Sequence, residues 1–299
     1  MSNNTKNNGS EELLTLKYKK RSRFAELVRR VGHNKGAVVG AIIIAVLLLT
    51  FLISLFIPFE AVTRQNVRIR LTPPSWQNPF GTDNTGRSVF LRVVYGARYS
   101  LAIGLGVVGF GVILGVIFGS IAGYYGGRTE QLIMRLSDVL SSIPGILFGM
   151  VIMTALGQNL PNLIFACGVT TIPVFVRITR ASVLAIRGNE FIEAAKAMGL
   201  SSVRIIYAEV LPNGLSPVIV TTTASLGLSI IVAASLSFIG FGVQVPRPEW
   251  GAMISSGRDF ARSAPWVMTF PGVAIMLTVL GFNLLGDGLR DALDPKLKR

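Results

Sequence analysis

The chain has 299 residues, of which 51% are hydrophobic and only 15% charged, and its mean hydropathy is +0.57. This composition excludes an ordinary soluble domain and predicts an integral membrane protein. The formal net charge of +14 does not indicate a nucleic-acid partner, because the basic residues gather at the ends of apolar runs and no soluble recognition element accompanies them.

Charge-free apolar runs predict an all-α integral membrane fold with six transmembrane helices. The first run, Gly36–Ile57, is long enough to cross a bilayer, and Ser100–Tyr125 is the second. The run from Val139 to Val176 is too long for one span, so the polar residues 157–162 are expected to divide it into a third and a fourth. The expected fifth and sixth spans are Leu215–Gly240 and Pro265–Gly286.

Six spans place both termini on one side, and the basic amino-terminal arm predicts that this side is the cytoplasm. About 20 Lys and Arg residues then lie inside and about 9 outside, as the positive-inside rule requires. The expected organisation is a basic cytoplasmic arm, a first transmembrane helix, an extracytoplasmic loop with an amphipathic helix, a five-helix core and a cytoplasmic tail. The arm is 1–35, the first transmembrane helix 36–58, the extracytoplasmic loop with its amphipathic helix 59–99, the five-helix core 100–286 and the tail 287–299. A cytoplasmic loop at 182–214 lies inside the core.

The second span carries a glycine at every fourth position: Gly111, Gly115, Gly119 and Gly123. Residues four apart share one face of a helix, and glycines there remove side-chain bulk. The pattern predicts a face on which a neighbouring helix packs closely.

Three further expectations concern the polar and proline residues around the spans. Residues Gly126–Ser137 are expected to form a short polar connection, and Asp138 to cap the beginning of the third span. Pro144 and Pro173 are expected inside the third and fourth spans, as kinks. An interfacial aromatic belt is expected from the tryptophans in or beside the outer segments, Trp76, Trp250 and Trp266.

The polar segment 189–213, between two apolar runs, predicts two short helices that meet at Gly199. Asn189 is expected to cap the first helix, whose first turn carries Glu190 and Glu193 where the helix dipole favours negative charge. Gly199 ends this helix, Ser201 or Ser202 begins the second, and Pro212 is expected to close it. By pattern alone, the segment is a surface connection between two spans.

The residues themselves add a resemblance to the EAA loop of binding-protein-dependent ABC importer permeases. It rests on Glu193-Ala194-Ala195, on Gly199 four positions later and on Leu211-Pro212. That family has an isoleucine three residues before the proline, where this chain has Glu209. The resemblance implies that this loop contacts an ATPase subunit through Glu193, Ala194, Ala195, Lys196, Gly199, Leu211 and Pro212.

Other stretches resemble the longer-loop permease subunit of dipeptide, oligopeptide and nickel importers. They are residues 81–101, in which Ser88 stands where an aspartate is usual, the loop 241–258 and the tail from Gly286. The resemblance implies a membrane-embedded permease that works with a second, homologous permease, two cytoplasmic ABC ATPases and an extracytoplasmic substrate-binding protein. It also implies that ATP and Mg²⁺ are bound by the ATPases, and that this chain needs no cofactor of its own.

The peptide assignment implied by the resemblance leaves open nickel chelates, glutathione or another small solute. Other function classes are disfavoured by the residues. The chain lacks a G-x-x-x-x-G-K-[ST] motif, and one His with one Cys supplies neither a metal site nor a nucleophile–base pair, so no enzyme is predicted. An ion-coupled carrier would need ionisable groups inside the spans, and only Asp138 lies near one. A non-transporting membrane scaffold remains an alternative, and no residue is assigned to substrate.

The extracytoplasmic loop contributes a last expectation, because it is rich in arginine. The arginines are Arg64, Arg68, Arg70, Arg87, Arg92 and Arg98. A net positive outer surface predicts an acidic docking face on the binding protein. Arg64, Arg68 and Arg70 are the residues expected to contribute to docking.

Overall fold

The computed structural model describes residues 23–293, and within that range the fold is helical with no β-strand. The basic residues before Arg23 and the last residues of the predicted tail lie outside the described residues. The long helices are α3 (Lys35–Ser54), α5 (Val89–Tyr125), α8 (Leu160–Ile186), α12 (Ser216–Phe238) and α14 (Trp266–Leu293). The shorter elements are α2 (Arg23–His33), α4 (Phe59–Thr63), η1 (Val67–Ile69), α6 (Gly127–Ser142), α7 (Gly145–Leu156), α9 (Glu190–Ala197), α10 (Ser202–Ile205), η2 (Ile206–Val210), α11 (Leu211–Gly214), α13 (Trp250–Gly257) and η3 (Arg258–Phe260).

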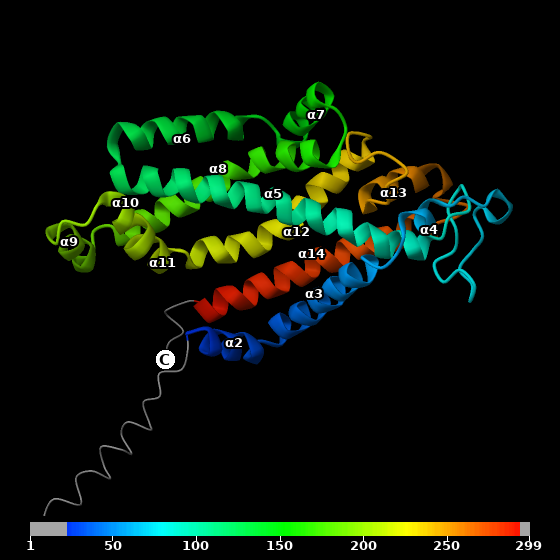
Figure 1. Ribbon diagram of the computed structural model, residues 1–299, viewed down its shortest axis with the longest axis horizontal. Coiled ribbons are helices and arrows are strands. Elements are labelled where there is room, and N and C mark those ends of the chain that lie inside the picture. Colours follow the sequence, from blue (N-terminus) through cyan, green and yellow to red (C-terminus); the bar gives the residue numbers. More distant parts are fainter. Residues whose placement is uncertain (1–22, 294–299) are drawn as a thin grey trace, which may run out of the picture.

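The five long helices are each long and apolar enough to cross a membrane. They run side by side along the long axis of the molecule (Figure 1). The α9, α10 and α11 helices gather at one end, and α4 and α13 at the other (Figure 1). We call these the α9 end and the α13 end.

The third span differs from the sequence prediction. The stretch expected as a polar connection is the helix α6, which continues through Asp138 to Ser142, so Asp138 lies within a helix instead of capping its start. Pro144 does not lie inside a helix: it precedes α7, and Ile143 before it is extended at φ −95° and ψ 125°. A proline disfavours helical geometry in the preceding residue, so the chain breaks here, and α6 and α7 form a pair bent by 86°. Pro173, by contrast, is buried inside α8 as expected.

The amphipathic helix and the second span are one helix, α5, with no break between them. Ser88 begins it by accepting a hydrogen bond from the Leu91 amide, and Gly126, at φ +68°, ends it. Its 37 residues correspond to a length of about 55 Å, against a hydrocarbon core of about 30 Å. The helix therefore projects well beyond the bilayer and connects the two ends of the molecule.

The glycine face of α5 lies against α8. A β-carbon at Gly115 would stand 2.2 Å from Phe175 Cβ, and one at Gly119 would stand 2.6 Å from the Val176 carbonyl oxygen. Gly111 and Gly123 are equally close to α8, at Thr171 and Val183. All four glycines are buried, so the two backbones approach to a distance that no larger residue permits.

We expect Gly115→Ala to destabilise the protein by about 1–3 kcal/mol, because one added methyl group overlaps Phe175 and forces α5 and α8 apart. The matched control is Gly109→Ala on the same helix, where a β-carbon meets nothing within 4 Å. Thermal melting of the purified variants in detergent measures the difference. Equal melting temperatures for the two variants would contradict the close packing of α5 on α8.

Candidate functional site

The segment from α9 to α11 at the α9 end is the first candidate site. Asn189 precedes α9 in an extended conformation, and its carbonyl oxygen accepts hydrogen bonds from the Ile192 and Glu193 amides at 2.9 and 3.3 Å. Its side chain makes no capping bond. Glu190 and Glu193 lie in the first turn and Lys196 in the last, and this charge distribution favours the helix dipole.

Gly199 ends α9 in a Schellman motif. Its φ is +78°, its N–H donates to the Lys196 carbonyl at 2.9 Å, and the Leu200 N–H donates to the Ala195 carbonyl at 3.2 Å. Both bonds satisfy carbonyls that a helix end would leave unpaired. The positive φ turns the chain so that α10 begins directly afterwards, at Ser202 with Ser201 as its cap residue.

Pro212 does not close the second helix, which corrects the expectation for this residue. Helical structure continues from α10 through the π-helix η2 into α11, and Pro212 is near the start of α11. A proline has no N–H for the carbonyl four residues earlier, and the wider π turn immediately before it absorbs that defect. Asn213 Nδ2 donates to the Glu209 carbonyl at 2.7 Å in the same turn.

One face of the α9–α11 segment, which we call its base, is buried. Ile192 and Ala195 of α9 pack with Ile205 and Val210, and with Val183 near the end of α8, in one apolar cluster. Ala195 is only 3% exposed, so it packs inside this chain instead of facing outward. The base therefore couples the position of α9 to the end of α8.

The opposite side of the segment is open and largely apolar. Glu193, Ala194, Lys196, Gly199 and Pro212 are exposed, whereas Leu211 is half-buried. Large apolar side chains surround them with 41 to 75% exposure: Phe191, Met198, Val203 and Tyr207. An exposed apolar patch of this kind, rimmed by charges, is typical of a protein-contact surface.

Charged side chains hold the end of α8 against α5 and α6. Arg180 of α8 forms an ion pair with Glu130 of α6, and its Nε lies 2.6 Å from Glu130 Oε1. Arg187 donates to the Gly123 carbonyl of α5 at 2.9 Å. The base of the α9–α11 segment is thus attached to α8 and, through α8, to α5 and α6.

A second structured site lies at the α13 end, where residues 59–88 and 241–260 form what we call the outer cap. Its centre is Asp83, whose carboxylate accepts from Arg87 Nε at 2.6 Å and from the Arg87 and Thr85 amides. Arg92 Nε lies 3.6 Å from the same carboxylate, and its Nη1 donates to the Val62 and Pro246 carbonyls. Asp83, Arg87 and Arg92 are all at least 94% buried.

Two opposing effects act on the Asp83 carboxyl group. Burial by itself raises its pKa, but the Arg87 guanidinium and the hydrogen bonds from Arg87 and Thr85 outweigh burial and hold the pKa below the ordinary value of 3.8. Asp83 therefore stays ionised and supplies the negative charge that two buried arginines require.

Glu249 begins α13 and is the other buried carboxyl group of the cap. It accepts hydrogen bonds from the Gly251 and Ala252 amides, both at 2.8 Å, which satisfies the first N–H groups of the helix. Complete burial raises the pKa of Glu249, and its amide bonds only partly oppose that effect. The residue is a buried helix cap.

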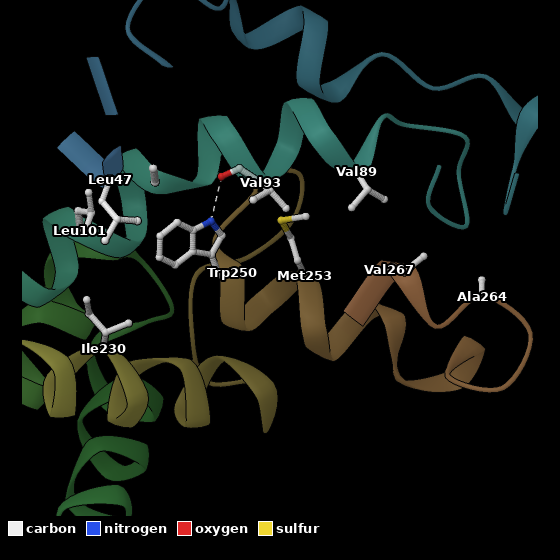
Figure 2. Packing of buried hydrophobic residues seen from close by; sticks show 10 residues of the cluster. Leu47, Val89, Val93, Leu101, Ile230, Trp250, Met253, Ala264 and Val267 are labelled. Carbon is white, nitrogen blue, oxygen red and sulfur yellow. Dashed lines mark hydrogen bonds between the residues drawn. The ribbon is translucent and has the colours of Figure 1, made fainter. Parts of the chain in front are cut away.

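Trp250 anchors α13 to α5, so the predicted interfacial belt is wrong for this residue. The side chain is 1% exposed, and Figure 2 shows its Nε1 aimed at the Val93 carbonyl, to which it donates at 2.9 Å. Met253, Leu101 and Ile230 pack in the same cluster (Figure 2). Trp266 likewise donates inward, to the Thr82 carbonyl at 3.1 Å, whereas Trp76 is fully exposed.

The outer arginines divide into two groups. Arg87 and Arg92 are buried against the cap, whereas Arg98 joins α5 to the end of α3 by donating to the Ser54 carbonyl and side chain. Arg64 and Arg68 instead line an open hollow of about 500 Å³, together with Ala61, Gln65 and Asn66. Within the described residues, neither Arg64 nor Arg68 makes a hydrogen bond or ion pair through its side chain.

The sequence analysis missed an ion pair between two candidate spans. Arg177 Nη2 of α8 lies 3.0 Å from Asp138 Oδ1 and 3.0 Å from Ser141 Oγ, both on α6. The sequence places Arg177 directly after the fourth apolar run, and in the structure it lies within α8, a helix long and apolar enough to span a membrane. The separation of 39 residues hides the pair in the sequence, although Asp138 and Ser141 do share a helix face.

Comparison with known proteins decides the family. Residues 115–299 match the model of the binding-protein-dependent transport system inner membrane component. The chain belongs to this family. It is a permease subunit of an ABC importer and a bacterial multi-pass inner-membrane protein, and its family is one of permeases, not of enzymes.

Similar relatives cover almost the whole permease. It is 45% identical to the dipeptide transport system permease protein DppC of Alkalihalophilus pseudofirmus, over 93% of this chain and 91% of that one. It is 42% identical to the di/tripeptide permease DppC of Pseudomonas aeruginosa, over 93% of both chains. It is also 42% identical to the glutathione permease GsiD of Escherichia coli strain 536, over 93% of this chain and 92% of that one.

Solved structures agree at the level of the fold. The permease superposes on a chain of the inward-facing methionine ABC transporter MetNI with a TM-score of 0.56 and 21% identity, covering 68% of this chain and 97% of the other. An amino acid ABC transporter chain gives a TM-score of 0.52 at 14% identity, covering 68% and 94%. In the part of the permease that the structure describes, no three His, Cys, Asp or Glu residues are grouped to hold a metal ion.

We expect Asp83→Asn to destabilise the outer cap by about 3–5 kcal/mol, because it leaves Arg87 and Arg92 buried without a counter-charge. Melting followed by the fluorescence of the buried Trp250 measures the loss. The matched control is Asp259→Asn, which breaks the exposed pair with Arg258 and leaves the melting unchanged. An Asp83 variant as stable as this control would contradict the central role of the carboxylate.

Proposed function

We propose that this permease forms half of a translocation pathway for peptides delivered by an extracytoplasmic binding protein. Its partners are a second homologous permease, two cytoplasmic ATPases that bind ATP and Mg²⁺, and the lipids around the spans. The observation that carries the coupling assignment is the α9–α11 segment, which is open and apolar on one side and packed onto α8 on the other. The names of the relatives support peptides as the transported class.

The proposed topology puts the α9 end in the cytoplasm, with both termini on the same side. Asn34, at the start of α3, donates to Asp291, near the end of α14, at 2.9 Å. Residues near the two ends of the described chain therefore lie together. The α13 end is then extracytoplasmic, and α5 passes from it to the cytoplasmic side.

Energy transfer follows from the way the α9–α11 segment is held. The exposed face around Glu193, Ala194 and Lys196 docks in a groove on an ATPase, together with Phe191 and Met198. When the two ATPases close on ATP, they pull α9, and its buried base transmits the movement to α8. Close packing of α8 on α5 passes the same displacement to the outer cap.

We expect Gly199→Val to abolish uptake while leaving membrane insertion intact. A β-branched residue at φ +78° costs about 1–2 kcal/mol and disrupts the Schellman turn that orients α9. The matched control is Gly188→Val, in the turn before α9, where a β-carbon meets nothing within 4 Å and φ is not positive. ATP-driven uptake of radiolabelled Ala-Ala by vesicles that hold the whole importer measures the effect. Normal uptake by Gly199→Val would refute the coupling assignment.

Glutathione is a second candidate substrate, because the glutathione permease GsiD of Escherichia coli strain 536 is 42% identical to this chain. Competition of unlabelled glutathione against Ala-Ala in the same vesicles separates the two assignments. Strong competition favours a route that accepts both, and weak competition favours dipeptides.

The hollow lined by Arg64 and Arg68 is the proposed contact for the binding protein, which docks on the outer cap. Two guanidinium groups that have no side-chain partner among the described residues favour carboxylates on the docking face. We expect Arg64→Glu/Arg68→Glu to weaken docking of the cognate binding protein at low salt, with a smaller effect at high salt. Arg70, which the sequence also predicts for docking, is exposed but lies outside the hollow, so Arg70→Glu is the comparison variant. Equal docking of the double variant, the comparison variant and the wild type would remove the hollow from the interface.

A further inference from the structure

The helix α6, which together with α7 is long and apolar enough to form a broken membrane span, exposes two different faces. A polar stripe recurs at intervals of four, three and four residues: Gln131, Arg135, Asp138 and Ser142. An apolar stripe displaced by one residue consists of Leu132, Leu136 and Val139. Both stripes are exposed, so neither is explained by packing within this chain.

The polar stripe meets a charged residue of the neighbouring helix. Arg177 of α8 pairs with Asp138, and the side chains of the two residues are 43% and 61% exposed. A different pair between the same helices, Arg180 with Glu130, is more enclosed, at 31% and 21%. The enclosed pair braces the helices, whereas the open pair presents both of its charges to the surroundings.

Lipid is an unsuitable environment for the open pair. Charged groups within spans face water-filled cavities or the interior of a bundle, and a short aspartate cannot extend to the headgroups as a lysine or arginine does. The apolar stripe of α6 is the face that suits hydrocarbon. The polar stripe lies about 100° around the helix from it and is suited to water.

We propose that the polar stripe of α6 and Arg177 line the aqueous translocation path, and that the Asp138–Arg177 pair binds the two charged termini of a peptide in transit. The carboxylate of Asp138 receives the peptide ammonium group, and the guanidinium of Arg177 receives the peptide carboxylate, with Ser141 as a neighbouring hydroxyl. The pair opens to accept a zwitterion and closes again on its release. This assignment rests on the proposed peptide-import function.

The Asp138–Arg177 pair is suited to binding a passing peptide weakly enough to release it. An exposed ion pair in water contributes little net free energy, so exchanging it for two pairs with a zwitterion is nearly balanced. The guanidinium fork binds a terminal carboxylate through two parallel hydrogen bonds and selects for its geometry. Peptide side chains are not contacted by the pair, which suits a route for peptides of varied sequence.

A labelling experiment tests the aqueous path independently of transport. Asp138→Cys and Val139→Cys are neighbours at nearly the same depth, on the polar and the apolar stripe respectively. In inside-out vesicles holding the whole importer, a charged, membrane-impermeant thiol reagent is expected to label Asp138→Cys and not Val139→Cys. The native Cys167 is buried and supplies a silent background. Equal labelling of both positions, or none at Asp138→Cys, would overturn the aqueous path.

A transport experiment tests contact with the peptide. In proteoliposomes with saturating binding protein, we expect Asp138→Asn and Arg177→Gln each to lower the Ala-Ala taken up per ATP hydrolysed by about tenfold. Their melting temperatures should stay near the wild-type value, because the pair is exposed. Glu130→Gln, in the enclosed pair, should keep the ratio of uptake to hydrolysis even if both rates fall.

The outcomes separate this proposal from the proposed function. An unchanged uptake ratio in Asp138→Asn and Arg177→Gln would overturn the peptide contact. If wild-type proteoliposomes take up no Ala-Ala, the peptide-import function fails, and the labelling pattern still decides whether the polar stripe faces water.

Discussion

Close contact between α5 and α8 underlies the arrangement of the whole permease. Lipid supplies no hydrophobic drive for helices to associate, so van der Waals contact between backbones must do so. Four glycines on α5 remove the side chains that would prevent it, and Phe175 of α8 fills the space above Gly115. Because α8 leads directly into the α9–α11 segment, this contact also affects where that segment lies.

The two ends of the permease are made rigid by different means, and α5 joins them. At the α13 end, buried charges and helix caps hold two loops onto the helix, through Asp83, Arg92 and Glu249. At the α9 end, an apolar cluster and the Arg187 contact hold the segment onto α5 and α8. These fixed contacts at both ends suit the proposed transmission of movement through α5, because a flexible loop at either end would absorb a displacement.

The arginines of this permease have different roles, and the amino-acid composition does not distinguish them. Arg87 and Arg92 are buried partners of Asp83, whereas Arg64 and Arg68 remain open on the surface. Within the spans, Arg180 braces two helices, and Arg177 stands on an open polar face. Burial decides between these roles, because a buried guanidinium needs a fixed counter-charge and an exposed one is available to a partner.

Features that depend on residues close together in the chain could be predicted before folding is considered. Apolar runs predicted the membrane class, glycines four apart predicted one packing face, and Gly199 predicted the end of α9, since each property follows from local geometry. The folded chain, and not the sequence, reveals that Ala195 packs inward, that Trp250 anchors α13, and that Asp138 meets Arg177. These outcomes depend on neighbours far away in the sequence, and burial and pairing are properties of the folded chain.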